Sequence, residues 1–322
     1  MSIKIPRGPL AIGVEELSLN ADDHRRLNHP LVGGVILFTR NFKDAEQLTD
    51  LTHAIKKIRS PELLISVDHE GGRVQRFRGN GFTELPALET FGTQYNQDPK
   101  LALKSATESA HTMAQELIQC GVDFSFAPVV DLHNPKSRVI ADRAFHQNPN
   151  VICELATAYM SGMRKAGMKN VIKHFPGHGT VEADTHKEVA VDERDLTTLY
   201  NEDLLPFQKL IKTQQVDSVL ASHVLYPKVD DKIVTFSKIW LTDILRDQLN
   251  FQGMIFSDDF GMHALTYQVS STTKAIQKFF QAGGDVALLC NDFKAIDQAL
   301  NDLEHTQLKT NLAQKWQALE TQ

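Results

Sequence analysis

The chain has 322 residues, of which 42% are hydrophobic and 23% charged, the composition of a globular protein with ample material for a core. Its net charge of −6 argues against a nucleic-acid partner and against an anionic membrane surface. No apolar run reaches the roughly 18 residues that a membrane span needs.

The N-terminus and the cysteines indicate the cellular compartment. The first residues, Met1 to Leu10, lack the apolar core of a signal peptide. Cys120, Cys153 and Cys290 are far apart, and each lies in or beside an apolar segment. We interpret them as reduced, buried thiols rather than as a disulfide framework or a zinc site, and we expect a cytoplasmic protein.

Short apolar runs recur along the chain, each followed by loop residues and then by a helical pattern. They span residues 10–14, 34–38, 63–67, 123–127, 170–173, 218–222, 253–257 and 285–289. Nearly continuous apolar runs of about five residues are typical of parallel strands that are buried on both faces. The sequence therefore predicts such strands at these positions.

Helices are predicted between and after these runs. They span residues 44–59, 100–120, 150–166, 241–249 and 272–282, with one or two closing helices in 293–320. Asp44 is placed to cap the first of them, and Gly121 follows the second, where glycine commonly ends a helix. Strands alternating with helices indicate an α/β fold, and we favour a single (β/α)8 TIM-type barrel over residues 1–322. An open doubly wound sheet has the same alternation and remains an alternative.

Polar residues follow five of the predicted strands, where a barrel carries its active site. These positions hold Asp68-His-Glu-Gly-Gly-Arg73, Asp131 with the loop 138–143, Lys173-His174, Ser222-His223 and Asp258-Asp259. Chance would not place polar groups at so many strand ends. The sequence therefore predicts one polar mouth at the carboxyl ends of the strands.

Asp258 and Asp259 end the seventh predicted strand. Adjacent side chains leave a strand in opposite directions, so only one of the two is expected to face the mouth, and we favour Asp258. The alternative role for a carboxylate at a strand end is to cap the next helix, and Asp259 suits that role better.

The loop after the fifth strand is rich in titratable side chains. Asp184 can hydrogen-bond the ring of His186, fix its tautomer and raise its basicity, so that the histidine donates and accepts a proton near neutral pH. The alternative is a surface loop whose aspartate stabilises a turn. Together with His174 and His178 these residues also suggest a metal, but their spacing matches no standard zinc motif and Lys173 would oppose a cation.

Asp68 precedes a Gly-Gly turn, with Arg73 and Arg76 beyond it. A carboxylate accepts hydrogen bonds from a vicinal diol, and the planar guanidinium of arginine donates two in a fixed geometry. This segment is therefore a plausible sugar-binding site. A structural Asp–Arg pair across the turn is the alternative. His223 is most simply explained as a buried, hydrogen-bonded histidine.

Taken together, these segments resemble glycoside hydrolase family 3, in particular its single-domain bacterial β-N-acetylglucosaminidases of peptidoglycan recycling. The matching pieces are Val67-Asp-His-Glu-Gly-Gly-Arg-Val-Gln-Arg-Phe77, Arg138-Val-Ile-Ala-Asp-Arg-Ala-Phe145, Lys173-His-Phe-Pro-Gly-His-Gly179 with Asp184-Thr-His186, and Phe256-Ser-Asp-Asp-Phe-Gly-Met262. They occur in the family's order, and the string that begins at Lys173 is highly specific.

The resemblance implies roles for the matching positions. Asp258 would be the nucleophile that forms a covalent glycosyl-enzyme, and His186, held by Asp184, would be the general acid/base. The residues that would bind the terminal N-acetylglucosamine through its hydroxyls are Asp68, Arg76, Arg143, Lys173 and His174. Two successive displacements retain the anomeric configuration. Most retaining glycosidases use two carboxyl groups about 5–5.5 Å apart, so a histidine acid/base departs from that pattern.

The chain also departs from the family's usual residues. His69, Phe260 and Ala141 stand where glutamine, leucine and glycine are common. The first two carry no chemistry in the implied scheme, whereas Ala141 is expected to shift its loop slightly.

The resemblance implies a cytoplasmic, exo-acting β-N-acetylglucosaminidase that removes terminal N-acetylglucosamine from cell-wall fragments such as N-acetylglucosaminyl-1,6-anhydro-muropeptides. We expect a monomer with no metal or other cofactor and no nucleic-acid or membrane partner. Three other functions stay open: a phosphorolytic relative, a catalytically silent sugar-sensing barrel, and a metal-dependent barrel lyase or aldolase. A histidine acid/base leaves less negative charge beside an incoming phosphate, and this favours the first of the three.

Overall fold

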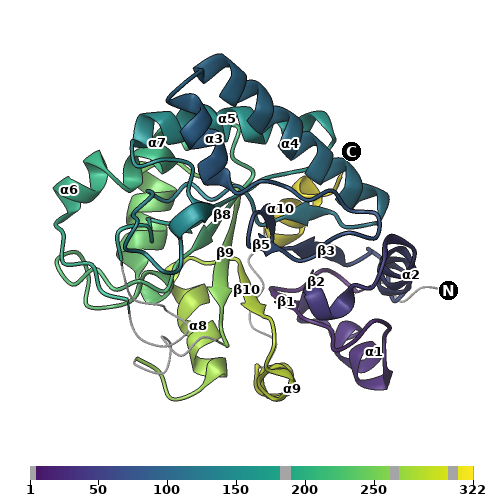
Figure 1. Ribbon diagram of the computed structural model, residues 1–322. Helices are drawn as coiled ribbons and strands as arrows, with labels where there is room; N and C mark the ends of the chain where they lie inside the picture. The colour runs from purple at the N-terminus through teal and green to yellow at the C-terminus, as the bar shows by residue number, and fades with distance from the viewer. Residues whose placement is uncertain (1–4, 182–189, 262–267, 304–310, 322) are drawn as a thin grey trace.

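The computed structural model describes residues 5–181, 190–261, 268–303 and 311–321, and its centre is a barrel of parallel strands (Figure 1). In chain order these are β1 (Leu10–Ile12), β2 (Val32–Leu37), β3 (Leu64–Val67), β6 (Phe124–Ser125), β7 (Val171–Phe175), β8 (Ser218–Ala221), β9 (Met254–Asp259) and β10 (Val286–Leu289). All eight match the predicted apolar runs.

The strands follow the chain once around the barrel. Their order in the sheet is β6-β3-β2-β1-β10-β9-β8-β7. The bridges Phe124↔Lys169 and Val129↔Lys173 join the segments at the two ends of this order. These bridges bring the sheet round on itself, so the predicted (β/α)8 barrel is confirmed and the open doubly wound sheet is wrong.

Helices surround the strands (Figure 1). They are α1 (Ala21–Leu27), α2 (Ala45–Lys56), α3 (Leu88–Tyr95), α4 (Pro99–Gln119), α5 (Pro149–Lys165), α6 (Leu196–Asn201), α7 (Leu204–Lys212), α8 (Thr272–Ala282), α9 (Phe293–Asp302) and α10 (Leu312–Ala318). Residues Thr39–Asn41, Ala141–Arg143 and Val234–Phe236 form 3-10 turns, and Ile239–Gln248 is π-helical. Every predicted helix is present, whereas α1, α3, α6 and α7 were not predicted. No helix in the described ranges is both long and apolar enough to span a membrane.

The cap of α2 and the state of the cysteines were also predicted. Asp44 caps α2, because its side chain accepts a hydrogen bond from the N–H of Gln47. The three cysteines are free, as expected; Cys120 and Cys290 are buried, but Cys153 is only partly so.

Trp316 of α10 closes the amino-terminal end of the barrel. Its buried indole donates from Nε1 to the carbonyl oxygen of Gly8 at 3.0 Å. A Cβ on Gly33 would lie 2.8 Å from atoms of the indole ring, and one on Gly34 would lie 3.0 Å away. The C-terminal helix is therefore part of the core, and β2 needs glycine where it passes the ring.

Asp285 holds the same end of the barrel together through charge. Its Oδ2 accepts from the N–H of Ile255 at 2.9 Å and forms ion pairs with Arg246 at 2.5 Å and Lys315 at 2.7 Å. The carboxylate is buried, so these partners replace the water it has lost.

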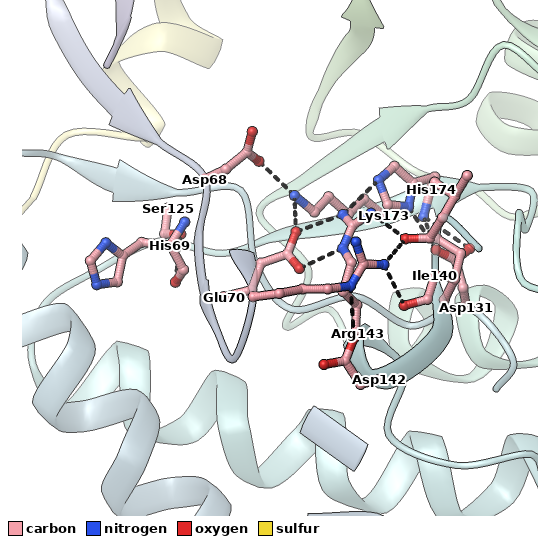
Figure 2. A network of polar contacts seen from close by, with 12 residues as sticks. Asp68, His69, Glu70, Ser125, Asp131, Ile140, Asp142, Arg143, Lys173 and His174 are labelled. Carbon is pink, nitrogen blue, oxygen red and sulfur yellow. Dashed lines mark hydrogen bonds and ion pairs between the residues drawn. The ribbon is translucent and has the colours of Figure 1, made fainter. Parts of the chain in front are cut away.

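A short hairpin follows β3 and carries residues toward the mouth. It consists of β4 (His69–Gly71) and β5 (Val74–Gln75), paired antiparallel. His69 packs against Phe77 and Phe82, with ring centroids 5.5 and 5.6 Å away, and burial lowers the pKa of His69 to about 3. Figure 2 shows Glu70 on the opposite side of the strand from His69, as successive residues of a strand must be.

Candidate active site

A cavity of about 410 Å³ lies at the carboxyl ends of the strands, where the polar mouth was predicted. Six of the predicted site residues line it: Asp68, Arg76, Arg143, Lys173, His174 and Asp258. The predicted acid/base pair, Asp184 and His186, lies outside the described residues. The structure thus brings the residue predicted to be the nucleophile and the residues predicted to bind the sugar to one place.

Figure 2 shows a chain of ion pairs along one wall of this cavity. The Nζ of Lys173 lies 2.7 Å from Asp68 Oδ1 and 2.6 Å from Glu70 Oε1. The Nε and Nη2 of Arg143 each donate to one oxygen of Glu70 at 2.8 Å, a bidentate arrangement. Arg76 contributes a longer pair with Asp68 at 3.4 Å. Three cations therefore share two carboxylates.

These cations keep both carboxylates ionised. Burial alone would raise the pKa of Asp68, but the charges of Lys173 and Arg76 outweigh it and hold that pKa below its ordinary value. Burial also opposes ionisation of Glu70, yet Arg143 and Lys173 lower its pKa to about 2. Asp68 still has about a fifth of its side chain exposed, whereas Glu70 has almost none. Asp68 can therefore reach a ligand, and Glu70 acts on the cations beside it.

His174 is held by a second buried carboxylate. Its Nδ1 lies 2.6 Å from Asp131 Oδ2, and Asp131 also accepts from the backbone N–H groups of His174 and His178. The Nε2 of His174 lies 3.4 Å from Arg143 Nη2, a donor. This network assigns the proton to Nδ1 and leaves the Nε2 lone pair to accept from Arg143. The peptide bond between Lys173 and His174 is cis.

Arg73 differs from its predicted role. Its Nε donates to Asp142 Oδ1 at 2.8 Å and its Nη2 donates to the Val139 carbonyl. Arg73 therefore connects the hairpin to the 138–143 loop and does not pair with Asp68. The Asp–Arg pair across the turn that was the alternative is formed by Arg76 with Asp68, and Arg73 still lines the cavity. In the same loop Ala141 has a φ of +42°, a conformation that glycine adopts more easily.

Asp258 and Asp259 are the last residues of β9, and both line the cavity. The two carboxylates differ in their partners, and Asp258 Oδ1 accepts from the N–H of Asp259 at 2.9 Å. Asp259 Oδ1 accepts from the N–H groups of Gly261 and Cys290, at 2.9 and 3.0 Å, and burial raises its pKa. Asp259 does not cap α8, because Ser271 does so by accepting from the N–H of Lys274.

Two other histidines near the mouth are buried, and His223 has the hydrogen-bonded surroundings that were expected. His223 is buried, with Nδ1 2.9 Å from Thr235 Oγ1 and Nε2 3.2 Å from the carbonyl oxygen of Asp259. His178 is also buried, and burial lowers its pKa to about 4. Within the described part of the chain, no cluster of three or more His, Cys, Asp or Glu side chains is arranged to hold a metal ion.

Glu70 and Asp131 complete the site, and the sequence interpretation gave them no role. Both lie in segments that were assigned to the mouth. The available signal was charge balance: Arg143, Lys173 and His174 were all predicted to point into one cavity, and buried cations need acidic partners. Glu70 and Asp131, which come after the third and fourth predicted strands, could supply these acidic partners.

A family model agrees with this geometry. The glycosyl hydrolase family 3 N-terminal domain matches residues 10–316, so the chain belongs to glycosyl hydrolase family 3. It is accordingly a glycoside hydrolase.

Individual relatives indicate which kind of glycoside hydrolase the chain resembles. The chain is 48% identical to a β-hexosaminidase of Nitrosomonas eutropha over 92% of this chain and 84% of that protein. It is also 48% identical to a β-hexosaminidase of Hydrogenovibrio crunogenus, over 93% and 83%. The crystal structure of NagZ from Neisseria gonorrhoeae in complex with N-trifluoroacetyl-D-glucosamine superposes with a TM-score of 0.93 at 42% identity, covering 99% of this chain and 91% of that one.

Proposed function

We propose that this β-N-acetylhexosaminidase is an exo-acting, retaining β-N-acetylglucosaminidase that removes the non-reducing terminal N-acetylglucosamine from peptidoglycan fragments. The observation that carries the proposal is the cavity in which Asp258 shares the walls with Asp68, Arg143, Lys173 and His174. The ionised carboxylate accepts hydrogen bonds and the fixed cations beside it donate them, a combination that suits the hydroxyls of one sugar.

The proposed reaction has two displacements. Asp258 attacks the anomeric carbon, and His186, held by Asp184, protonates the departing glycosidic oxygen. A covalent glycosyl-enzyme results. His186 then removes a proton from water, which attacks the same carbon and releases Asp258. Each step inverts the configuration, so the product retains it.

The physiological setting is also a proposal. The substrates would be N-acetylglucosaminyl-1,6-anhydro-N-acetylmuramic acid peptides in cell-wall recycling, hydrolysed in the cytoplasm by a monomer that is a single catalytic domain. The relatives named β-hexosaminidase and the N-trifluoroacetyl-glucosamine bound to the Neisseria protein support this substrate class. No cofactor, nucleic acid or membrane takes part in the scheme.

A panel of aryl β-glycosides tests the substrate assignment. We expect kcat/KM for the N-acetylglucosaminide to exceed that for the glucoside and the N-acetylgalactosaminide by at least about 100-fold, the discrimination that a site built to hydrogen-bond particular substituents can supply. A preference for the glucoside would contradict the assignment. The same assays with added phosphate separate hydrolysis from phosphorolysis, because only the latter yields a sugar 1-phosphate.

A further inference from the structure

Arg194 lies outside the cavity and joins two segments that flank residues 182–189. Thr180 precedes this stretch and Asp192 follows it, and the Thr180 hydroxyl donates to Asp192 Oδ2 at 3.2 Å. Arg194 binds both residues, through Nε and Nη2 to the Asp192 carboxylate and through Nη2 to Thr180 Oγ1. We call Thr180, Asp192 and Arg194 the clasp.

The clasp is fixed to the barrel on its far side. Arg194 Nη1 lies 2.7 Å from Asp203 Oδ2 and 2.5 Å from Glu202 Oε2. Asp203 is buried, and its Cβ and carboxylate pack against Gly177, where a Cβ would lie within 3.0 Å of them. Burial raises the pKa of Asp203 to about 6, although Arg194 opposes this shift. One guanidinium therefore connects three carboxylates and a hydroxyl.

Each segment of the clasp is also tethered separately. Before the stretch, the Tyr226 hydroxyl donates to the carbonyl oxygen of Gly177 at 2.5 Å. After it, the N–H of Leu225 donates to the carbonyl oxygen of Ala190, and the N–H of Asp192 donates to Leu225, both at 2.9 Å. These hydrogen bonds hold each segment, and among the hydrogen bonds and ion pairs of the described residues only the clasp joins the two segments to each other.

We propose that Arg194 is a positioning residue for the reaction: it fixes the distance between the two ends of the stretch that carries Asp184 and His186, and so aligns proton transfer to the leaving group. This inference rests on the proposed function, in which His186 is the acid/base. A single arginine suits the task because its planar fork holds several acceptors in one fixed geometry, which lysine cannot do.

The test compares leaving groups. Arg194→Ala and Thr180→Val are assayed on aryl β-N-acetylglucosaminides whose phenols range from acidic to weakly acidic. An acidic phenol leaves without protonation, so misalignment of the acid should spare it. We expect kcat/KM to fall at least about 10-fold for the least acidic phenol and less than about 3-fold for the most acidic, with a smaller effect of the same kind in Thr180→Val.

Arg246→Ala is the matched control, because Arg246 also pairs with a buried aspartate, Asp285, but at the opposite end of the barrel. It should lower thermal stability and slow all substrates alike. His186→Ala run in parallel separates the two hypotheses. If the loss of kcat/KM depends on the leaving group in His186→Ala but not in Arg194→Ala or Thr180→Val, the inference about the clasp is wrong and the proposed function stands. If His186→Ala shows no such dependence, the acid/base assignment is wrong and the inference falls with it.

Discussion

Glu70 is a single buried carboxylate that fixes two of the proposed substrate-binding cations. It holds Arg143 through two hydrogen bonds of 2.8 Å and Lys173 through an ion pair of 2.6 Å, and it is not among the residues that line the cavity. Removing its charge would leave two cations partly unpaired in a dry site, which is costly. The effect should reach the substrate through Arg143 and Lys173.

We therefore expect Glu70→Gln to lower kcat/KM by about 10- to 100-fold, or about 1.4–2.8 kcal/mol at 1.4 kcal/mol per factor of ten. Steady-state kinetics on an aryl β-N-acetylglucosaminide measures this. Asp285→Asn is the control, since Asp285 also joins an arginine and a lysine but at the amino-terminal end of the barrel. Equal losses of kcat/KM in the two folded variants would show that Glu70 acts only on stability.

The sequence was sufficient to predict most of the residues in the cavity. Asp68, Lys173 and Asp258 could be found because each stands at the end of an apolar run, and parallel strands in a barrel end at one face. Glu70 and Asp131 could not be assigned so easily. Their roles depend on which cation each one meets across the barrel, and that is set by three-dimensional closure rather than by spacing along the chain.

The β4–β5 hairpin is anchored by an uncharged histidine. Neither ring nitrogen of His69 has a hydrogen-bond partner among the described residues, and the ring is enclosed by Phe77 and Phe82. Because its pKa falls from 6.5 to about 3 on folding, only the unfolded chain binds a proton between these values. The stabilising contribution is thus present above pH 6.5 and is lost as the pH falls toward 3.

Replacing this ring with one that cannot titrate should remove that pH dependence. As the pH falls below 6.5, we expect the free energy of unfolding of the wild type to fall faster than that of His69→Phe. The difference should change by at most about 1.4 kcal/mol per pH unit. Denaturant unfolding at several pH values measures the difference. His53→Phe is the control, because His53 is exposed on α2. Parallel curves for the wild type and His69→Phe would contradict the prediction.

Strands were easier to predict than helices for a physical reason. A strand buried on both faces must be apolar nearly throughout, and this signal survives in runs of four or five residues. The helices α1, α3 and α6 have 7, 8 and 6 residues, too few for a periodic pattern to be distinct, and such short helices depend on packing for their stability. In α6 the capping Asp195 was the one available signal.

At the scale of the whole molecule, the barrel assigns different tasks to its two ends. The amino-terminal end is closed by Trp316 and the buried Asp285 cluster, and the carboxyl end carries the cavity. The alternation of strands and helices was sufficient to predict parallel strands. The closure between β6 and β7 could not be deduced from it, because an open sheet alternates in the same way.

The central claim is that Asp258 becomes covalently attached to the sugar, and trapping that intermediate tests it most directly. A 5-fluoro-N-acetylglucosaminyl fluoride should slow both steps, because fluorine destabilises the oxocarbenium-like transition state, while its fluoride leaving group favours the first step. Peptide mass spectrometry after brief incubation should find one added sugar on the peptide that contains Asp258, and Asp258→Ala should carry none and lose turnover. A sugar on another residue, or near-wild-type turnover in Asp258→Ala, would contradict the account.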